Sequence, residues 1–267
     1  MAYHSGVPAR IALTREVPAR ISECELTHLE RVPIDRARAV GQHAEYEAAL
    51  RAAGCSVEQL PPAPDLPDSV FVEDTAVVFD EVAVIARPGA PSRRGETPAV
   101  AAALARVRPM HHIERPGTLD GGDVLRAGRR VFVGLSTRTN RAGAEQLRAL
   151  LRRFDYVVET IETTGCLHLK SAATMLADDW LLVNPDWVDV GRFGGFRLLD
   201  VHPSEPFAAN VLCIGDVALC AEAAPLTRAG LDANGLNTVA VDVSELAKAE
   251  AGLTCCSLII ESLIPHP

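Results

Sequence analysis

The chain has 267 residues, of which 48% are hydrophobic, and its formal net charge is −9 at pH 7. This length and composition suffice for one large core or two small ones. No apolar run reaches the roughly 18 to 20 residues of a membrane span, and no apolar signal-peptide segment follows residues 1–6. We therefore expect a cytoplasmic protein. The acidic charge disfavours nucleic acid as a partner, because phosphates require a basic face, and is compatible with a cationic small molecule.

The hydrophobic pattern predicts short strands and helices from the N-terminus onward. In the first part of the chain we expect a strand at 9–13, a loop at 14–21 that could act as a lid, a helix at 36–53 and a strand at 56–60. A repeating pattern then begins, with an apolar strand at 68–79 that is interrupted by acidic residues. Its return strand is expected at 82–86, its loop at 87–96 and its helix at 97–107.

The same order of elements recurs along the rest of the chain. The second cycle is expected at 119–125, 131–134, 142–154 and 156–161, and the third at 166–171 and 180–183. The fourth is expected at 209–214, 217–220, 224–234 and 238–241. The fifth starts at Cys255, so that only the N-terminal strand remains to complete it.

Candidate site residues stand at positions 74, 120, 168, 210 and 255, which are separated by 46, 48, 42 and 45 residues. A near-constant period, with a strand, turn, strand, helix and strand in each unit, is typical of an internally repeated domain. A propeller-like ring would bring the five strand beginnings to one axial channel. We predict an α/β fold, a five-bladed α/β-propeller of ββαβ modules around a pseudo-five-fold axis, in one domain over 1–267. An irregular α/β domain with accidental spacing is the alternative.

Seven cysteines occur without a C-x-x-C spacing or a Cys/His metal pattern, which argues against a disulfide framework and against a zinc site. Two of them, Cys255 and Cys256, stand just before an apolar run at 258–260. A cysteine at the mouth of a strand can act as a nucleophile, because its thiolate attacks carbon while the strand stays rigid. Two buried thiols that pack as small hydrophobic groups would explain the pair without any function.

Three carboxylates, those of Asp68, Glu73 and Asp74, flank or interrupt the apolar run at 70–79. Acidic side chains in such a run are costly unless they are paired. They could pair with an internal arginine. They could instead hold a cationic substrate group, and a guanidinium suits them because its forked donors bind carboxylates bidentately.

His168 stands between two leucines and would be an ordinary core residue unless a carboxylate accepts its ring proton. Asp120 or Asp123, one unit earlier, could do so and would then fix the tautomer that acid–base chemistry needs. Gly121 and Gly122 would permit a close backbone approach, although a flexible turn also explains them.

Arg93 and Arg138 both fall in loops after the second strand of their units. Either guanidinium could contact a substrate carboxylate, because arginine binds carboxylates with two parallel hydrogen bonds. Most loop arginines are simply solvated, so this placement leaves their role open.

Six strings in this chain, taken together and in order, resemble the dimethylarginine dimethylaminohydrolases, a family of the guanidino-group-modifying, pentein-fold superfamily. The strings are FVED at 71–74, RPGAPSRR at 87–94, LDGGDV at 119–124, GLS with RTN at 134–140, LHLKS at 167–171 and LTCCS at 253–257. The resemblance covers about 9–260. It implies a five-bladed ring of ββαβ modules that hydrolyses N-omega-methylated L-arginine to L-citrulline and methylamine or dimethylamine, without a cofactor or metal.

The resemblance also implies a role for each matching position. Cys255 would be the nucleophile, His168 the general acid/base and Asp120 its orienting carboxylate. The substrate-binding residues it implies are Asp68, Glu73 and Asp74 for the guanidinium, Arg93 and Arg138 for the substrate carboxylate, Leu13 in the lid region, and Ala249 for the α-amino group. The expected partner is therefore a methylated arginine, and the expected state is a monomer or homodimer.

Arginine deiminase and agmatine deiminase are the nearest alternatives. They carry an acidic residue two positions after the histidine, where this chain has Lys170. The chain is also short for the extra helical domain of arginine deiminase, and agmatine has no carboxylate for Arg93 and Arg138 to bind. A different class of function is a non-catalytic ring that only captures a basic amino acid or a partner protein.

Overall fold

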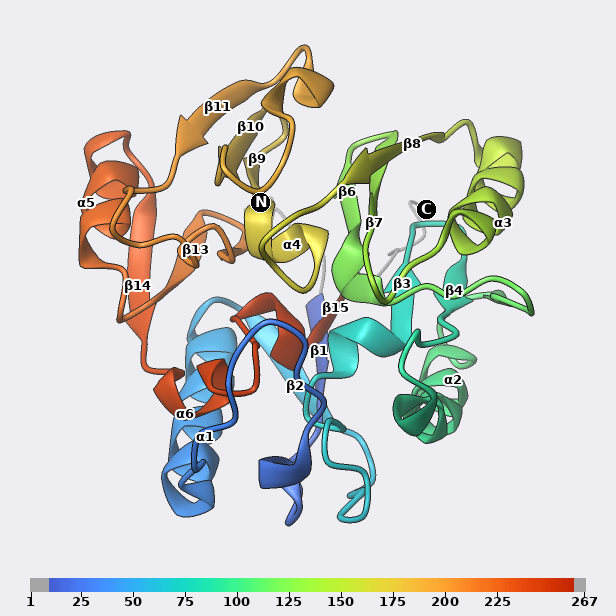
Figure 1. The fold of residues 1–267 in the computed structure, drawn as a ribbon, viewed down its shortest axis with the longest axis horizontal. Helices are drawn as coiled ribbons and strands as arrows, with labels where there is room; N and C mark the ends of the chain where they lie inside the picture. The colour runs from blue at the N-terminus through green and yellow to red at the C-terminus, as the bar shows by residue number, and fades with distance from the viewer. Residues whose placement is uncertain (1–9, 262–267) are drawn as a thin grey trace, which may run out of the picture.

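Five three-stranded sheets stand in a ring around a common centre (Figure 1). The computed structural model describes residues 10–261, so the segment 1–6 and Ala9, the first residue of an expected strand, lie outside the described residues. Each sheet is built from one repeat, in which the first strand pairs antiparallel with the second and the second pairs parallel with the third. The predicted five-bladed α/β-propeller is confirmed.

Four modules follow one another from the middle of the chain. Module 1 contains β3 (Ala76–Val78), β4 (Ala83–Ile85), α2 (Thr97–Leu104) and β5 (Met110–His112). Module 2 contains β6 (Val124–Ala127), β7 (Arg130–Leu135), α3 (Arg141–Leu151) and β8 (Val157–Glu162). Module 3 contains α4 (Leu169–Ala172), β9 (Ala173–Ala177), β10 (Trp180–Val183) and β11 (Arg197–Asp200). Module 4 contains β12 (Leu212–Ile214), β13 (Val217–Ala221), α5 (Pro225–Ala233) and β14 (Asn237–Val241).

Module 5 joins the two ends of the described chain, as the repeat predicted. Its strands and helix are β15 (Leu258–Glu261), β1 (Arg10–Thr14), α1 (Arg36–Ala52) and β2 (Cys55–Gln59). Strand β1 pairs with β15 on one side and with β2 on the other, and Arg10 lies opposite Glu261. The Asp35 side chain caps α1 by accepting the N–H of Arg38, which satisfies a free donor at the start of the helix. The ring is therefore closed by pairing between distant parts of the sequence.

Three expected strands begin later than predicted, because a helical turn precedes each of them. The turns are η2 (Val72–Thr75), η4 (Gly121–Asp123) and α4, and a fourth turn, η7 (Thr254–Cys256), precedes β15. The apolar runs hide this break, since a short apolar segment has no periodicity that separates strand from helix. Turn η2 packs against both η4 and η7, so the turns bring the polar residues together near the ring axis.

The expectation of a helix between the second and third strands of every unit is wrong for module 3. A 3-10 turn, η6 (Val190–Phe193), stands where the other modules carry an α-helix. Gly191 lies in this turn, and Gly194 and Gly195 directly follow it. Glycine disfavours a helix interior by about 1 kcal/mol relative to alanine.

A hydrogen bond ties module 5 together at the buried core between α1 and the ring. The Tyr46 hydroxyl on α1 lies 2.7 Å from the Ser257 hydroxyl, and both side chains are buried. Ser257 directly follows the two cysteines, so helix α1 holds the backbone that carries them. No helix among residues 10–261 has both the length and the apolar character that crossing a bilayer requires.

Gly121 offers a test of how closely the turns pack. A Cβ atom at this position would lie 2.0 Å from the Glu73 carbonyl oxygen and 2.7 Å from that of Ala76. We expect Gly121→Ala to lower the free energy of unfolding by about 1–3 kcal/mol, because neither carbonyl can move without shifting η2. Gly230, inside α5, has no atom within 4 Å of its added Cβ, so Gly230→Ala is the matched control. Urea denaturation measures both; equal stability of the two variants would contradict close packing at η4.

Candidate active site

A narrow cavity lies where the helical turns of the ring meet. It has room for about one water molecule, with a free volume of about 10 Å³. Seven of the ten predicted site residues line it: Asp68, Asp74, Arg93, Arg138, His168, Ala249 and Cys255. Four modules contribute these side chains, and so only closure of the ring assembles them.

His168 is held between two buried carboxylates. It lies at the N-terminal boundary of α4 in an extended conformation, and not inside a strand as predicted. Its Nε2 lies 3.1 Å from Asp120 Oδ2, and its Nδ1 lies 3.6 Å from Asp74 Oδ1. Burial disfavours charge on the ring, but the attraction of Asp74 and the hydrogen bond to Asp120 outweigh it and raise the pKa of His168 to about 9. His168 is therefore an imidazolium at neutral pH.

The two acidic candidates of module 2 have different tasks. Asp120 contacts the histidine ring, and its other oxygen accepts the backbone N–H of Gly89 at 2.9 Å. Asp123 instead accepts the Ser136 hydroxyl at 2.7 Å and the Leu169 N–H at 2.9 Å. Burial raises the pKa of Asp123 to about 6. Asp120 thus orients the ring of His168, while Asp123 supports α4, the short helix that directly follows His168.

Cys255 faces the cavity from turn η7. Its sulfur accepts the backbone N–H of Gly252 at 3.3 Å. Burial raises the pKa of the Cys255 thiol to about 12, and the nearby carboxylates of Glu73 and Asp74 act in the same direction. The resting cysteine is therefore a thiol, and a cation beside it would favour the thiolate.

Cys256 points elsewhere. Its side chain is fully buried and belongs to the hydrophobic cluster around Tyr46 and Leu50 of α1. Burial raises the pKa of its thiol well above the usual value. Of the two adjacent cysteines, only Cys255 lines the cavity.

Asp74 is paired with an internal arginine, which is one of the two possibilities that the sequence left open. Arg93 Nη1 donates to Asp74 Oδ2 at 2.6 Å, and Arg93 Nη2 donates to Glu96 Oε2 at 2.9 Å. Burial alone would raise the pKa of Asp74, but His168 and Arg93 lower it to about 2. Because Nη1 carries two hydrogens and makes one bond, Arg93 retains one N–H for a further acceptor.

Arg138 differs from Arg93 in having unused binding capacity. Its Nη2 donates to the Thr27 hydroxyl at 3.2 Å. Its Nη1 is buried and has no hydrogen-bond partner, and no carboxylate of residues 10–261 lies within 4 Å of its guanidinium. A buried cation of this kind is suited to an anionic group that enters the cavity.

Glu73 lies behind the cavity and not on its wall. It accepts the Lys170 ammonium at 2.6 Å and the Thr254 hydroxyl at 2.6 Å. Asn210 bridges Thr254 and the Lys170 carbonyl, which gives this candidate a structural task. A wider cavity of about 400 Å³, lined by the first strands of the modules, reaches Glu73 and Lys170 from another side.

Two expectations about the N-terminal region are wrong. Leu13 lies in β1 and packs with Leu60 and Leu258 in the core, so it does not reach the cavity. The loop at 14–21 is not a lid either, because Val17 and Ile21 are buried in the core. Instead the following segment, through Glu25, lines the cavity.

The contacts made by Asp68 also involve this segment. Both carboxylate oxygens of Asp68 lie 3.2 Å from the backbone nitrogen of Glu25. Burial raises the pKa of Asp68. The sequence did not single out Glu25, or Glu250 on the opposite wall, because nothing in either string predicts a contact between segments so far apart.

Asp74, Asp120 and His168 each place one potential metal-ligand atom within 4.8 Å of the others. The donor set does not favour a metal ion, because the raised pKa keeps a proton on His168 and Arg93 already binds Asp74. The arrangement is a network of ion pairs that holds an acid beside a cysteine.

Comparisons with known proteins agree on the kind of protein. A family model described as arginine deiminase matches residues 62–202. The N(G),N(G)-dimethylarginine dimethylaminohydrolase of Streptomyces coelicolor is 42% identical over 258 residues, covering 96% of this chain and 99% of that protein. The protein of the same name from Pseudomonas aeruginosa is 34% identical and covers 90% of this chain and 96% of that protein.

Solved structures extend the agreement to the fold. A mutant of the Pseudomonas aeruginosa enzyme in complex with citrulline has a TM-score of 0.90 at 32% identity, covering 95% of this chain and 100% of that one. The N-terminal domain of a cyanobacterial arginine dihydrolase shares the fold, with a TM-score of 0.86 at 18% identity over 95% of this chain and 98% of that one.

The proton on His168 can be measured directly. Its pKa of about 9 lies above the ordinary 6.5, so the stabilisation from protonating it is complete below pH 6.5 and is lost as the pH rises through about 9. We expect nitrogen NMR to show the imidazolium at pH 7, and Asp120→Asn to lower the titration midpoint by at least about one unit. Asp216→Asn, in the turn between β12 and β13, is the control. A wild-type midpoint near 6.5 would contradict the ion-pair network.

Proposed function

The chain belongs to the dimethylarginine dimethylaminohydrolase family, and from this premise we propose that it hydrolyses N-omega-methylated L-arginine to L-citrulline. The substrates are asymmetric dimethylarginine and monomethylarginine, and the second product is dimethylamine or methylamine. The observation that carries the proposal is the position of His168 between Asp120 and Asp74, at the same cavity as Cys255. These residues supply a nucleophile, a proton donor and an anionic site for a guanidinium.

Binding of the substrate exchanges internal contacts for contacts with the substrate. Asp68 and Asp74 receive the guanidinium. Arg138, whose Nη1 is unpaired, receives the α-carboxylate, together with the remaining N–H of Arg93. The backbone of Ala249, which lines the same cavity, contacts the α-amino group. Bidentate pairing between guanidinium and carboxylate fixes the plane of the substrate before attack.

The first chemical step uses the positive charge of the substrate. A guanidinium beside Cys255 lowers the pKa of the thiol, which the neighbouring carboxylates otherwise keep high. The thiol releases its proton to solvent, and the thiolate attacks the guanidinium carbon and forms a tetrahedral adduct. His168 transfers its proton to the leaving nitrogen, the C–N bond breaks, and methylamine or dimethylamine departs from a covalent thiouronium.

The second step consumes one water molecule. His168, now neutral, takes a proton from the water as the oxygen attacks the thiouronium carbon. This first proton of the water restores the imidazolium of His168. The C–S bond then breaks, the remaining hydroxyl proton passes to the sulfur as the carbonyl of citrulline forms, and citrulline leaves the thiol of Cys255. Asp120 keeps the ring oriented through both transfers, because its oxygen lies 3.1 Å from Nε2.

Lys170 separates this proposal from deimination of unmethylated arginine. Its ammonium binds Glu73 at 2.6 Å, so this carboxylate is neutralised by an internal cation. The position two after His168 thus carries a cation that is bound behind the cavity, and it offers no carboxylate to the guanidinium site. This suits a methylated nitrogen more than an unmethylated one that would need a hydrogen-bond acceptor.

A citrulline assay of the purified protein tests the activity. We expect citrulline and dimethylamine from asymmetric dimethylarginine and little citrulline from arginine. Cys255→Ser should reduce kcat by roughly 10³-fold or more, because a neutral hydroxyl replaces the nucleophile. Cys256→Ala, which removes a sulfur that does not line the cavity, should leave kcat within a few-fold. Turnover of arginine in preference would move the protein to the deiminases, and loss of activity in Cys256→Ala alone would reverse the assignment of the pair.

Arg138 should govern recognition of the α-carboxylate. We expect Arg138→Ala to raise KM for dimethylarginine by roughly 10- to 100-fold, since a hydrogen bond to a charged group contributes about 1.5–3 kcal/mol. The same variant should barely affect a dimethylated agmatine, which lacks the carboxylate. Arg141→Ala, at a side chain that is 69% exposed, is the control. Equal losses on both substrates would show that Arg138 acts on the fold and not on the carboxylate.

A further inference from the structure

The segment 25–31, called the covering segment here, borders the cavity through Glu25 and packs one apolar side chain, that of Leu26, against the core. Glu25 lines the cavity, whereas the residues from Thr27 to Arg31 are exposed. Polar bonds therefore hold this covering segment in place. Since the cavity has room for about one water molecule, about 10 Å³, an amino acid can enter only if part of the wall moves. Because residues 27–31 of the covering segment are exposed, this part can move at lower cost than a buried part of the wall.

Two of the bonds that hold the covering segment come from residues that the substrate is proposed to engage. Asp68 accepts the N–H of Glu25, and Arg138 donates to the Thr27 hydroxyl. A bound guanidinium competes for Asp68, and a bound carboxylate competes for Arg138. These two bonds are therefore weakened by the ligand that the covering segment encloses.

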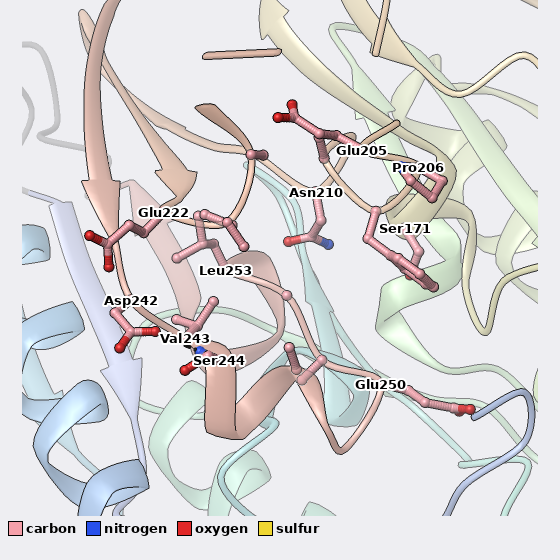
Figure 2. Close-up of a pocket in the computed structure, with 18 of the residues that line it drawn as sticks. Ser171, Glu205, Pro206, Asn210, Glu222, Asp242, Val243, Ser244, Glu250 and Leu253 are labelled. Atoms are coloured by element: carbon pink, nitrogen blue, oxygen red, sulfur yellow. Dashed lines mark hydrogen bonds between the residues drawn. The ribbon is translucent and has the colours of Figure 1, made fainter. Parts of the chain in front are cut away.

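Glu250 supplies a third attachment that the proposed substrate contacts do not include. Its carboxylate accepts the backbone N–H groups of Thr27 at 3.0 Å, of Leu29 at 2.5 Å and of His28. Three consecutive N–H groups that converge on one anion form a nest, which is a strong anion-binding arrangement of the backbone. Figure 2 shows Glu250 at the edge of a second cavity, with its carboxylate beside the N-terminal loop.

The backbone of Glu250 is also unusual. Its φ is +59°, in the left-handed region, where glutamate is rarely found. It follows the short helix α6 (Ser244–Ala247), at a place where glycine is the usual residue because it has no steric penalty. The conformation is sterically unfavourable for a residue with a Cβ atom. The carboxylate that reaches the nest accounts for a glutamate at a position that favours glycine.

Glu250 connects the covering segment to the catalytic wall. It lines the narrow cavity beside Ala249, and it also lines the second cavity of about 310 Å³. Gly252, two residues later, donates its N–H to the sulfur of Cys255. Glu250 is therefore only two residues from the backbone N–H that binds the sulfur of Cys255.

We propose that Glu250 is a positioning residue whose carboxylate anchors the covering segment 25–31. It does so while Asp68 and Arg138 release their bonds to this segment and bind the substrate. The anchor keeps one end of the segment attached, so that it recloses over the bound amino acid and water is excluded during the first step. This role rests on the proposed function for its effect on catalysis. The attachment itself exists in the unliganded protein and can be tested there.

Two substitutions separate an anchoring role from a purely structural one. Glu250→Gly removes the carboxylate but relieves the left-handed backbone, so the thermal unfolding midpoint should stay equal or rise. Glu250→Gln keeps a residue with a Cβ atom in the left-handed conformation and removes only the charge. Glu222→Gln is the matched control, because Glu222 is an exposed acid on the wall of the same second cavity.

The first readout is amide hydrogen exchange at Thr27, His28 and Leu29 without substrate. We expect at least about a tenfold increase in both Glu250 variants and no change in Glu222→Gln. The second readout is steady-state kinetics with dimethylarginine, where kcat/KM should fall about tenfold, mainly through KM. Unchanged exchange at these three amides would overturn the proposal. So would a lower unfolding midpoint of Glu250→Gly with faster exchange throughout α6, since that result shows a structural cap. A wild-type protein that releases no citrulline would defeat the proposed function while leaving the exchange test valid.

Discussion

The buried ion pairs around His168 are the constraint on which the site depends. An imidazolium with carboxylates at both ring nitrogens is stable away from water only when each charge has a partner at short range. Here Asp120 and Asp74 come from different modules than His168 itself. The network can form only once the ring has closed, so assembly of the fold and creation of the proton donor are one event.

The same network explains why the resting site is compact. Internal cations occupy the carboxylates, with Arg93 on Asp74 and Lys170 on Glu73. Burial, together with those carboxylates, raises the pKa of the Cys255 thiol and keeps it protonated. In the proposed mechanism a cationic substrate binds Asp74 beside Cys255 and favours the thiolate, while Lys170 stays on Glu73. We propose that Cys255 therefore stays an unreactive thiol until a guanidinium arrives, which limits side reactions of its sulfur.

The repeat was predictable because it rests on spacing, which tertiary packing does not alter. The near-constant separation of the polar positions identified five modules and the pairing of the two chain ends. The predicted starts of three strands were wrong, because helical turns such as η2 stand there and the apolar runs do not reveal them. Leu13 was misplaced for a related reason: it stands close in sequence to the covering segment, but β1 turns it into the core. Asp120 and Asp123 could be separated only by distances.

The sequence by itself determined the ring and the kind of chemistry, since these follow from period and from residue type. It carried the cysteine, the histidine, the carboxylates and the arginines in strings specific enough to indicate a family. The tertiary structure decided which of them meet. It placed Glu73 behind the cavity, left Arg138 with an unpaired donor, and brought Glu250 to the loop at 27–29. Contacts of this kind join residues up to 223 positions apart. No local pattern records them, because only ring closure creates them.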